Sequence, residues 1–414
     1  MAKLICAWAV MTLNIFLIFG AVFFAFALVS KRIEGTIITA PILFALGGLA
    51  LSSVLAETAG LSYSEGGLHV LAELTLILVL AADASQISFD ELKKQKAIPA
   101  RLLLIALPLI ILLGTLVGYT IFPEMGWYGA ALIAAILAPT DAALGASVLA
   151  NESVPAKIRQ GLNVESGLND GIALPAVLFF ACFLNITHQT GEENWLIFLS
   201  LQVIIGPIAG LIVGWIGGNL IAGAAKKGWM TSGFQGVAAI ALAVIAFATA
   251  EICHGNGFIA AFIAGLTYGN LHVSYSKFLH EFTETESQFL SYLTFFLFGA
   301  LILPEAIHHV NGQIVLYATF SLTLIRMIPV FISMIGAGHR LPTIAFMGWF
   351  GPRGLASLLF ALLVLEDLQV EQAEFIQTVV ATTVLFSIVL HGITAAPLSK
   401  RLGRGAQVDI DLWN

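Results

Sequence analysis

Charged residues are scarce in this sequence. Asp, Glu, Lys and Arg together make up 10% of its 414 residues, whereas a soluble globular protein carries about 25%. Hydrophobic residues make up 59% of the chain, and the mean hydropathy is +0.95. So much apolar surface exceeds what one core in water can hide, which excludes an ordinary soluble domain. The composition predicts a membrane protein that crosses the bilayer many times.

Cysteine is nearly absent as well. Cys6, Cys182 and Cys253 lie far apart, within or beside apolar runs, which excludes a zinc-binding spacing and a disulfide framework. No His/Cys cluster offers a transition-metal site, so we expect no cofactor. No basic patch is interleaved with aromatic residues, so we expect no nucleic-acid partner. The G-x-S-x-G and H-E-x-x-H motifs and the paired aspartates of membrane proteases are also missing, which argues against an enzyme.

Long apolar runs are what the sequence has in abundance. Their continuity excludes the alternating strands of a β-barrel, so we predict an all-α polytopic membrane protein. Dividing the chain at clusters of Gly, Pro and charged residues gives thirteen predicted transmembrane helices. Their approximate ranges are 4–29, 36–55, 67–87, 97–121, 127–149, 160–184, 195–224, 232–252, 257–271, 282–303, 312–336, 343–365 and 373–398.

The basic residues support this division. Fifteen of the 18 Lys and Arg residues fall in alternate loops, and the loops between them carry acidic residues instead. Because cytoplasmic loops are enriched in Lys and Arg, we expect the N-terminus outside and the C-terminus in the cytoplasm, with the protein in an inner or plasma membrane. The fifteen residues are Lys31, Arg32, Lys93, Lys94, Lys96, Arg101, Lys157, Arg159, Lys226, Lys227, Lys277, Arg340, Lys400, Arg401 and Arg404.

Three acidic residues lie inside the fifth and sixth predicted helices. Asp141, preceded by Thr140, is in the fifth, and Glu165 and Asp170 are in the sixth. A charged side chain at the bilayer centre costs roughly 3 kcal/mol or more, so such residues are paired, protonated or turned towards water. Intramembrane acids typically mark ion pathways. We therefore expect an ion site at mid-membrane.

Other polar side chains accompany the acids of the sixth helix. Glu165 and Asn169 are four residues apart, as are Ser166 and Asp170. Residues with this spacing share one face of a helix, so the four form a patch about one turn tall. Their carboxylate, hydroxyl and amide oxygens suit a hard monovalent cation that must shed water.

Two arginines also lie inside predicted helices, Arg326 in the eleventh and Arg353 in the twelfth. They can neutralise two of the three acids, which leaves one carboxyl group without a counter-charge. Desolvation makes such a group take up either a proton or a cation. This competition is the coupling that an ion exchanger requires. The alternative is that both arginines form purely structural pairs.

The two halves of the sequence show a weak internal similarity. The motif A-P-T-D at 138–141 in the fifth helix is matched by G-P-R-G at 351–354 in the twelfth, with a charge of opposite sign. Interruptions at matching positions of two halves indicate the binding site of a transporter. An acid in one break and an arginine in the other can neutralise opposite helix-end dipoles. The alternative is that each proline only kinks its helix.

This internal similarity suggests how the single transmembrane domain, residues 1–414, is organised. Residues 1–185 and 232–398 can form two six-helix repeats of inverted topology. The helix at 195–224 then joins the repeats, and 399–414 is a short cytoplasmic tail.

Six segments carry a resemblance to a known family. They are G-L-N-V-E-S-G-L-N-D-G at 161–171, P-T-D at 139–141, R-x-x-P at 326–329, G-P-R-G at 351–354, N-G-F-I-A-A-F-I-A-G-L-T-Y-G-N at 256–270 and E-L-T-L-I-L-V-L-A-A-D-A at 73–84. They resemble the monovalent cation:proton antiporter family 1, the sodium/proton exchangers with an Asn-Asp motif. The resemblance spans essentially the whole chain, and E-S-x-L-N-D is its most specific part. It implies thirteen helices, a dimerisation region and a mobile core on two crossing broken helices, the fifth and the twelfth.

The resemblance also implies a function. The chain is expected to exchange Na⁺, with Li⁺ and K⁺ as alternatives, against H⁺ by an elevator-like movement in a homodimer. Asp170 matches the aspartate that binds cation and proton in turn. Asn169 matches the asparagine of electroneutral members, which implies exchange of one ion for one. Thr140 and Ser166 would add oxygens to the bound cation.

The remaining site residues follow from the same resemblance. Glu165 matches a glutamate that pairs with an arginine, for which Arg326 is the first choice. Asp141 and Arg353 match the acid and the base of the two crossing breaks, and Asp141 is included among the expected ion-binding residues.

Alternatives also stay open at three further points. A proton- or cation-selective channel, or a transporter-like sensor, is the alternative function. Glu73 and Asp83 in the third helix either line a cytoplasmic funnel or cap helix ends. Glycines at every fourth position from Gly206 to Gly218 form a face of small residues for close packing, either between protomers or within one.

Overall fold

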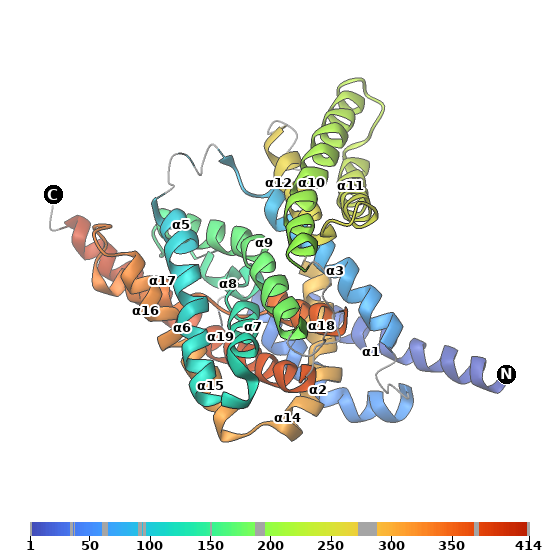
Figure 1. Cartoon of the computed structure of the whole chain (residues 1–414), viewed down its shortest axis with the longest axis horizontal. Helices are drawn as coiled ribbons and strands as arrows, with labels where there is room; N and C mark the ends of the chain where they lie inside the picture. The colour runs from blue at the N-terminus through green and yellow to red at the C-terminus, as the bar shows by residue number, and fades with distance from the viewer. Residues whose placement is uncertain are drawn as a thin grey trace.

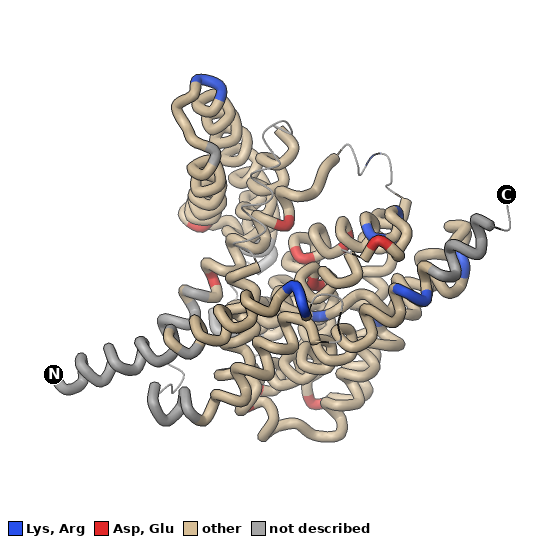
Figure 2. The backbone as a smooth tube through the Cα atoms, turned by 180° about the vertical axis from the view of Figure 1, so that it is seen from behind, with Lys and Arg blue, Asp and Glu red and all other residues tan. Residues whose placement is uncertain are grey.

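The computed structural model describes residues 2–33, 36, 38–59, 65–89, 93, 97–149, 151–186, 195–271, 288–367 and 372–411. Within these ranges the secondary structure is helical, as the composition predicts, and no strand is present. The helices pack into one body from which α1 and the end of α19 project on opposite sides (Figure 1). Charged residues are sparse along the helices (Figure 2).

The helices follow the predicted ranges closely, and several are interrupted. They are α1 (Ala2–Ile33), α2 (Ala40–Ala59), α3 (Glu65–Ser85), α5 (Ala97–Arg101), α6 (Leu107–Ile121), α7 (Gly126–Ile136), α8 (Ala142–Leu149), α9 (Ala156–Ile186), α10 (Trp195–Lys226), α11 (Ser232–Ile252), α12 (Gly257–Leu271), α14 (Leu303–His309), α15 (Gly312–Leu322), α16 (Leu324–Ser333), α17 (Leu341–Trp349), α18 (Leu355–Asp367) and α19 (Ala373–Asp411). Short turns of other helical types are η1 (Leu102–Ala106), η2 (Pro123–Met125) and η4 (Phe298–Ile302).

Among the described residues, seven helices are long and apolar enough to cross a membrane. Two shorter apolar helices, Ala40–Ser53 and Gly257–Leu271, accompany them. The last helix, α19, continues to Asp411, beyond the predicted boundary at residue 398. The seven helices are Ala97–Ile121, Ala156–Leu184, Ser200–Lys226, Gly233–Ile252, Gln288–His309, Gly312–Ser333 and Ala373–Gly403.

The fifth and twelfth predicted helices are broken in the middle. The first break separates α7 from α8 at residues 137–141, and the second separates α17 from α18 at residues 350–354. Pro139 and Pro352 lie in these breaks, and proline cannot supply the N–H that a continuous helix needs. The chain leaves helical geometry in both places, so the prolines mark breaks and not simple kinks. The two breaks meet, because the backbone N–H of Asp141 donates to the carbonyl oxygen of Pro352 at 2.8 Å.

The glycine stripe of α10 packs against α12 of the same chain. A Cβ atom on Gly206 would lie 2.8 Å from the carbonyl oxygen of Asn256, and one on Gly214 would lie 2.8 Å from that of Ala264. Such close backbone approach requires small residues. The stripe therefore works within one protomer, and α10, α11 and α12 form a group at one end of the molecule (Figure 1).

We expect Gly210→Ala to destabilise this group of helices. The new Cβ would overlap the carbonyl oxygen of Ala260, and overpacking of this kind costs about 1–3 kcal/mol. The matched control is Gly223→Ala in the same helix, where no atom lies within 4 Å of the added methyl group. Thermal denaturation of the detergent-solubilised protein should show a lower midpoint for Gly210→Ala alone. Equal midpoints for the two variants would contradict this packing.

Candidate functional site

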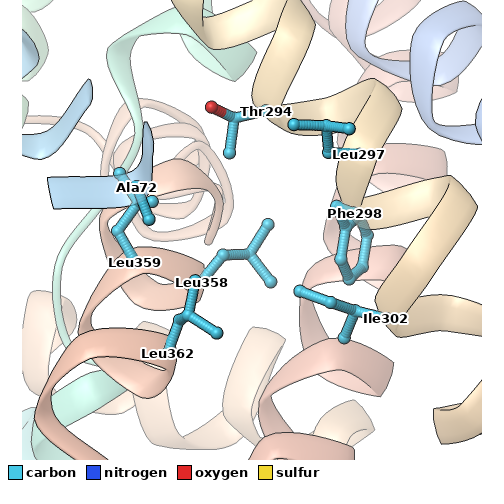
Figure 3. Close-up of a pocket in the computed structure, with 8 residues that line it drawn as sticks. All are labelled: Ala72, Thr294, Leu297, Phe298, Ile302, Leu358, Leu359 and Leu362. Atoms are coloured by element: carbon cyan, nitrogen blue, oxygen red, sulfur yellow. The ribbon is translucent and has the colours of Figure 1, made fainter. Parts of the chain in front are cut away.

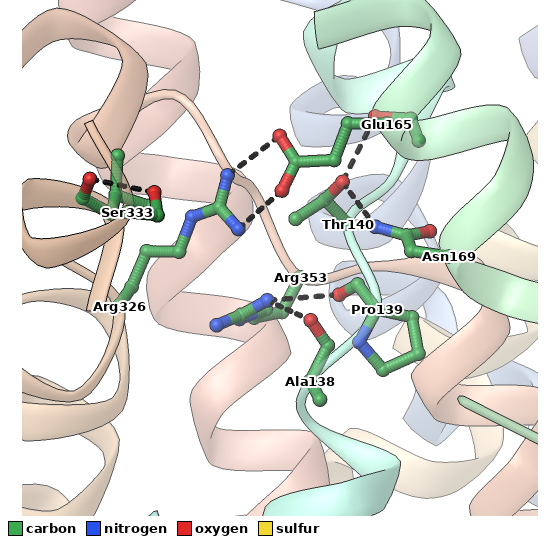
Figure 4. Close-up of polar contacts among 10 residues, drawn as sticks. Ala138, Pro139, Thr140, Glu165, Asn169, Arg326, Ser333 and Arg353 are labelled. Atoms are coloured by element: carbon green, nitrogen blue, oxygen red, sulfur yellow. Dashed lines mark hydrogen bonds and ion pairs between the residues drawn. The ribbon is translucent and has the colours of Figure 1, made fainter. Parts of the chain in front are cut away.

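The two helix breaks are held together by reciprocal polar contacts. The carboxylate of Asp141 accepts from the backbone N–H of Leu144 at 2.9 Å and from that of Leu355 at 2.5 Å. It therefore caps the N-terminal ends of α8 and α18 together. From the other break, Nη1 of Arg353 donates to the carbonyl oxygens of Ala138 and Pro139 beyond the C-terminal end of α7 (Figure 4). A carboxylate at helix N-termini and a guanidinium at a helix C-terminus both match the helix dipole.

Glycines on either side of Arg353 make this close approach possible. A side chain on Gly351 would overlap the guanidinium of Arg326, and one on Gly354 would overlap the carboxylate of Asp141. The motif G-P-R-G therefore combines a proline that ends the helix, an arginine that crosses to the other break, and two glycines that leave room for charged partners.

Glu165 in α9 forms a buried ion pair with Arg326 in α16. The guanidinium donates from Nη1 to Oε1 at 2.5 Å and from Nη2 to Oε2 at 2.8 Å (Figure 4). The side chains are only 1% and 3% exposed, so the pair is shielded from water and both carboxylate oxygens are engaged. Parallel bonds of this type fix the geometry of both partners. The arginine expected from sequence to meet Glu165 is the one that does so.

Three polar side chains connect the first break to α9. The amide of Asn169 donates to the hydroxyl of Thr140 at 2.7 Å (Figure 4). The hydroxyls of Thr140 and Ser166 lie 2.9 Å apart. All three residues are buried. This arrangement brings side-chain oxygens from the broken helix and from α9 to one place.

Asp170 lies one residue beyond Asn169 in α9 and is 6% exposed. Within the part of the chain that the structure describes, its Oδ1 atom is buried and has no hydrogen-bond partner, and the same holds for Oδ1 of Asn169. Buried acceptor atoms normally have a partner. Two such oxygens on neighbouring residues fit a site that takes a cation or a proton.

The structure thus brings the predicted site residues into one region but distributes the charges differently from a simple count of acids and arginines. Arg326 meets a carboxylate, whereas Arg353 meets two backbone carbonyls. Asp141 meets backbone N–H groups instead of an arginine. Of these five charged side chains, all except Asp170 therefore have an identified partner in the described structure.

A further acid belongs to this region. Asp83 in α3 lies in the same region as Asp141 and Asp170. The backbone of Asp83 also faces α9, because a Cβ atom on Gly167 would lie 3.5 Å from its carbonyl oxygen. The sequence predicted two alternative roles for Asp83, lining a cytoplasmic funnel or capping a helix end. Its position near the end of a long apolar run was the available signal.

The described residues contain no group of three or more His, Cys, Asp or Glu side chains arranged to hold a metal ion together. One hollow lies between α3, the helix Gln288–His309 and α18, but its walls are apolar (Figure 3). Its one hydroxyl, that of Thr294, already donates to the carbonyl oxygen of Leu290. This hollow therefore offers an ion no side-chain oxygen other than that of Thr294. Its lining residues are Ala72, Thr294, Leu297, Phe298, Ile302, Leu358, Leu359 and Leu362.

The pair of Glu165 and Arg326 predicts a strong coupling in stability. Glu165→Leu alone or Arg326→Met alone leaves a buried charge without its partner, which costs about 3–5 kcal/mol. The double variant removes both charges, so we expect it to be more stable than either single variant. Thermal midpoints of the four proteins form a double-mutant cycle. Additive effects would show that the two side chains do not act as a pair.

Comparisons with known proteins agree with this architecture. Residues 18–401 match the family model described as sodium/hydrogen exchanger, transmembrane. The Na(+)/H(+) antiporter NhaP of Pseudomonas aeruginosa is 29% identical over 361 residues, which cover 82% of this chain and 83% of that protein. The K(+)/H(+) antiporter NhaP of Alkalimonas amylolytica is 26% identical over 285 residues, which cover 67% of this chain and 47% of that protein.

The fold has a solved counterpart. The sodium proton antiporter MjNhaP1 from Methanocaldococcus jannaschii, at pH 8, aligns with a TM-score of 0.74 and 20% identity over 93% of this chain and 96% of its own. That likeness concerns the fold. Because the family model covers nearly the whole chain, it confirms the family that the motifs predict. The chain belongs to the sodium/hydrogen exchanger family of multi-pass membrane antiporters.

Proposed function

We propose that this protein exchanges a monovalent cation for H⁺ and that Asp170 carries both ions in turn. The observation that supports this most strongly is the buried Oδ1 of Asp170 without a hydrogen-bond partner in the described structure. Thr140, Ser166 and Asn169 form a hydrogen-bonded group between the first break and α9, the helix of Asp170, and supply further oxygens. Carboxylate, hydroxyl and amide oxygens are suitable ligands for a hard alkali cation.

The exchange follows from competition for one carboxylate. A proton on Asp170 removes the negative charge that attracts the cation, and a bound cation disfavours the proton. The site can then cross between the two sides of the membrane with one ion or the other. Of the expected ion-binding acids, Glu165 is paired with Arg326, and Asp141 accepts two backbone hydrogen bonds. We therefore assign these two acids to support of the site, and Thr140 and Ser166 to direct contact with the cation.

A single titrating acid leads to electroneutral exchange of one cation for one proton. Asn169, whose amide donates to Thr140, cannot carry a second negative charge. Na⁺ is the first candidate for the cation and Li⁺ and K⁺ are the alternatives. The names of the relatives include both a Na(+)/H(+) and a K(+)/H(+) antiporter. No cofactor is required.

The transport cycle that we propose is an elevator movement of the crossing helices. The contacts between the two breaks, from Asp141 to Pro352 and from Arg353 to Pro139, join them into a unit that can move as one body. We further propose thirteen spans in two inverted repeats with the N-terminus outside and the C-terminus in the cytoplasm, on the basis of the alternating basic loops. A homodimer is part of this proposal. The glycine stripe of α10 is occupied by α12, so the dimer contact must use other surfaces.

We expect Asp170→Asn to abolish cation-driven proton movement in everted vesicles or proteoliposomes. The amide keeps the size of the side chain but can neither carry a negative charge nor exchange a proton. The matched control is Glu305→Gln, because Glu305 is exposed at the start of α14, away from the breaks. Equal amounts of folded protein must be compared. Wild-type proton flux in Asp170→Asn would refute the proposed function.

We also expect cation and proton to compete kinetically. In proteoliposomes, acidification on the cation side should raise the apparent KM for the cation by about tenfold per pH unit where the proton occupies the site, while the maximal rate stays constant. The exchange rate should not respond to an imposed voltage. A current that persists without a counter-ion would identify a channel instead. The same measurement with Na⁺, Li⁺ and K⁺ ranks the three cations.

A further inference from the structure

A histidine that the exchange mechanism does not use lies against the second helix break. His391 in α19 is 1% exposed, and its Nε2 atom lies 2.9 Å from the carbonyl oxygen of Trp349 at the end of α17. Because a carbonyl oxygen can only accept, Nε2 must carry the hydrogen of this bond. The rings of His391 and Trp349 also pack with their centroids 5.1 Å apart.

The other side of the imidazole ring reaches the backbone of Arg353 through one serine. Nδ1 of His391 lies 3.1 Å from the hydroxyl of Ser387, one turn earlier in α19. That hydroxyl accepts from the backbone N–H of Arg353 at 2.7 Å. In a neutral ring with its hydrogen on Nε2, Nδ1 accepts from Ser387, so every donor in this chain has an acceptor. The carbonyl oxygen of Ser387 lies 3.0 Å from Nδ1. A protonated ring would therefore donate from Nδ1 to this carbonyl and from Nε2 to that of Trp349.

His391 and Ser387 therefore span the break. One holds the last carbonyl of α17 and the other holds the N–H of Arg353, just before α18. In a continuous helix these two groups would bond to each other. In the break the Trp349 carbonyl also accepts from the backbone N–H of Gly351 at 2.9 Å, so the Arg353 N–H is the group that depends on α19. An unpaired buried group costs about 1–3 kcal/mol. The two side chains sit four residues apart on α19, which places them on one face of the helix.

From Arg353 the contacts continue to the ion site. Its guanidinium holds the carbonyl of Pro139, and the next residue, Thr140, is bonded to Ser166 and Asn169. A shift of Arg353 would therefore move Thr140 relative to α9, where Asp170 lies.

We propose that His391 is a positioning residue for ion binding: with Ser387 it fixes the second break, so that Arg353 sets the position of Thr140 beside Asp170. This inference rests on the proposed exchange function. It concerns the shape of the site and not a contact with the ion. It assigns to α19 a role in the affinity for the cation.

The test compares the cation KM and the turnover per folded protomer of His391→Leu and His391→Gln in proteoliposomes. Leucine fills a similar volume without polar atoms, so we expect the KM to rise by about tenfold. Glutamine can donate an amide N–H to Trp349, so we expect its KM to stay within about twofold of the wild type. A merely structural role would reduce the amount of folded protein and leave the KM unchanged.

Ser387→Ala tests the same idea by a smaller change. It removes the acceptor of the Arg353 N–H, so we expect the KM to rise by about tenfold, as in His391→Leu. This variant can be measured even if His391→Leu fails to fold. The matched control is Thr383→Val, because the buried Thr383 hydroxyl donates within α19 to the carbonyl of Val379. A wild-type KM in Ser387→Ala, or a KM in His391→Gln equal to that of His391→Leu, would overturn the inference. Absence of exchange by the wild-type protein would refute the proposed function instead.

Discussion

The structure depends on how two broken helices satisfy each other's ends. Each break exposes backbone N–H and C=O groups inside a body with little water, and each such group needs a partner. Asp141 supplies an anion to two helix N-termini, and Arg353 supplies a cation to the carbonyls at the end of α7. The Asp141 carboxylate and the Arg353 guanidinium therefore neutralise the dipoles of helix ends and do not neutralise each other. This use of charge joins the two breaks without a direct salt bridge between Asp141 and Arg353 in the described contacts.

The same distribution of charge explains why, of Asp141, Glu165 and Asp170, one acid is available for ions. Glu165 and Arg326 neutralise each other in a buried pair with two parallel hydrogen bonds. Asp141 is engaged with backbone N–H groups. Asp170 is left in α9 with a buried oxygen that has no partner among the described residues, on the same helix as Ser166 and Asn169, which bond to Thr140. An acid in these surroundings is stabilised by whichever positive ion reaches it, which is the physical basis of the proposed exchange.

Much of this could be predicted from sequence, and the failures have physical reasons. Proline and charge inside apolar runs located both breaks, and the i, i+4 spacing located the polar face of α9. The partners of Arg353 could not be predicted, because they are backbone carbonyls. Every residue has one, so the residue types do not show which carbonyls an arginine will meet. The glycine stripe predicted a close contact, but only the fold could show that α12 covers it. His391 is a lone histidine in an apolar helix, and its role depends on a break 42 residues away in sequence.

The central claim is that one carboxyl group holds either a proton or a cation. The most direct test adds Na⁺, Li⁺ or K⁺ to purified protein in detergent, in a weakly buffered solution with a pH indicator, and measures the protons released for each cation bound. We expect cation binding to release protons in a one-to-one ratio and Asp170→Asn to release none. Saturable cation binding to the wild-type protein without proton release would contradict it.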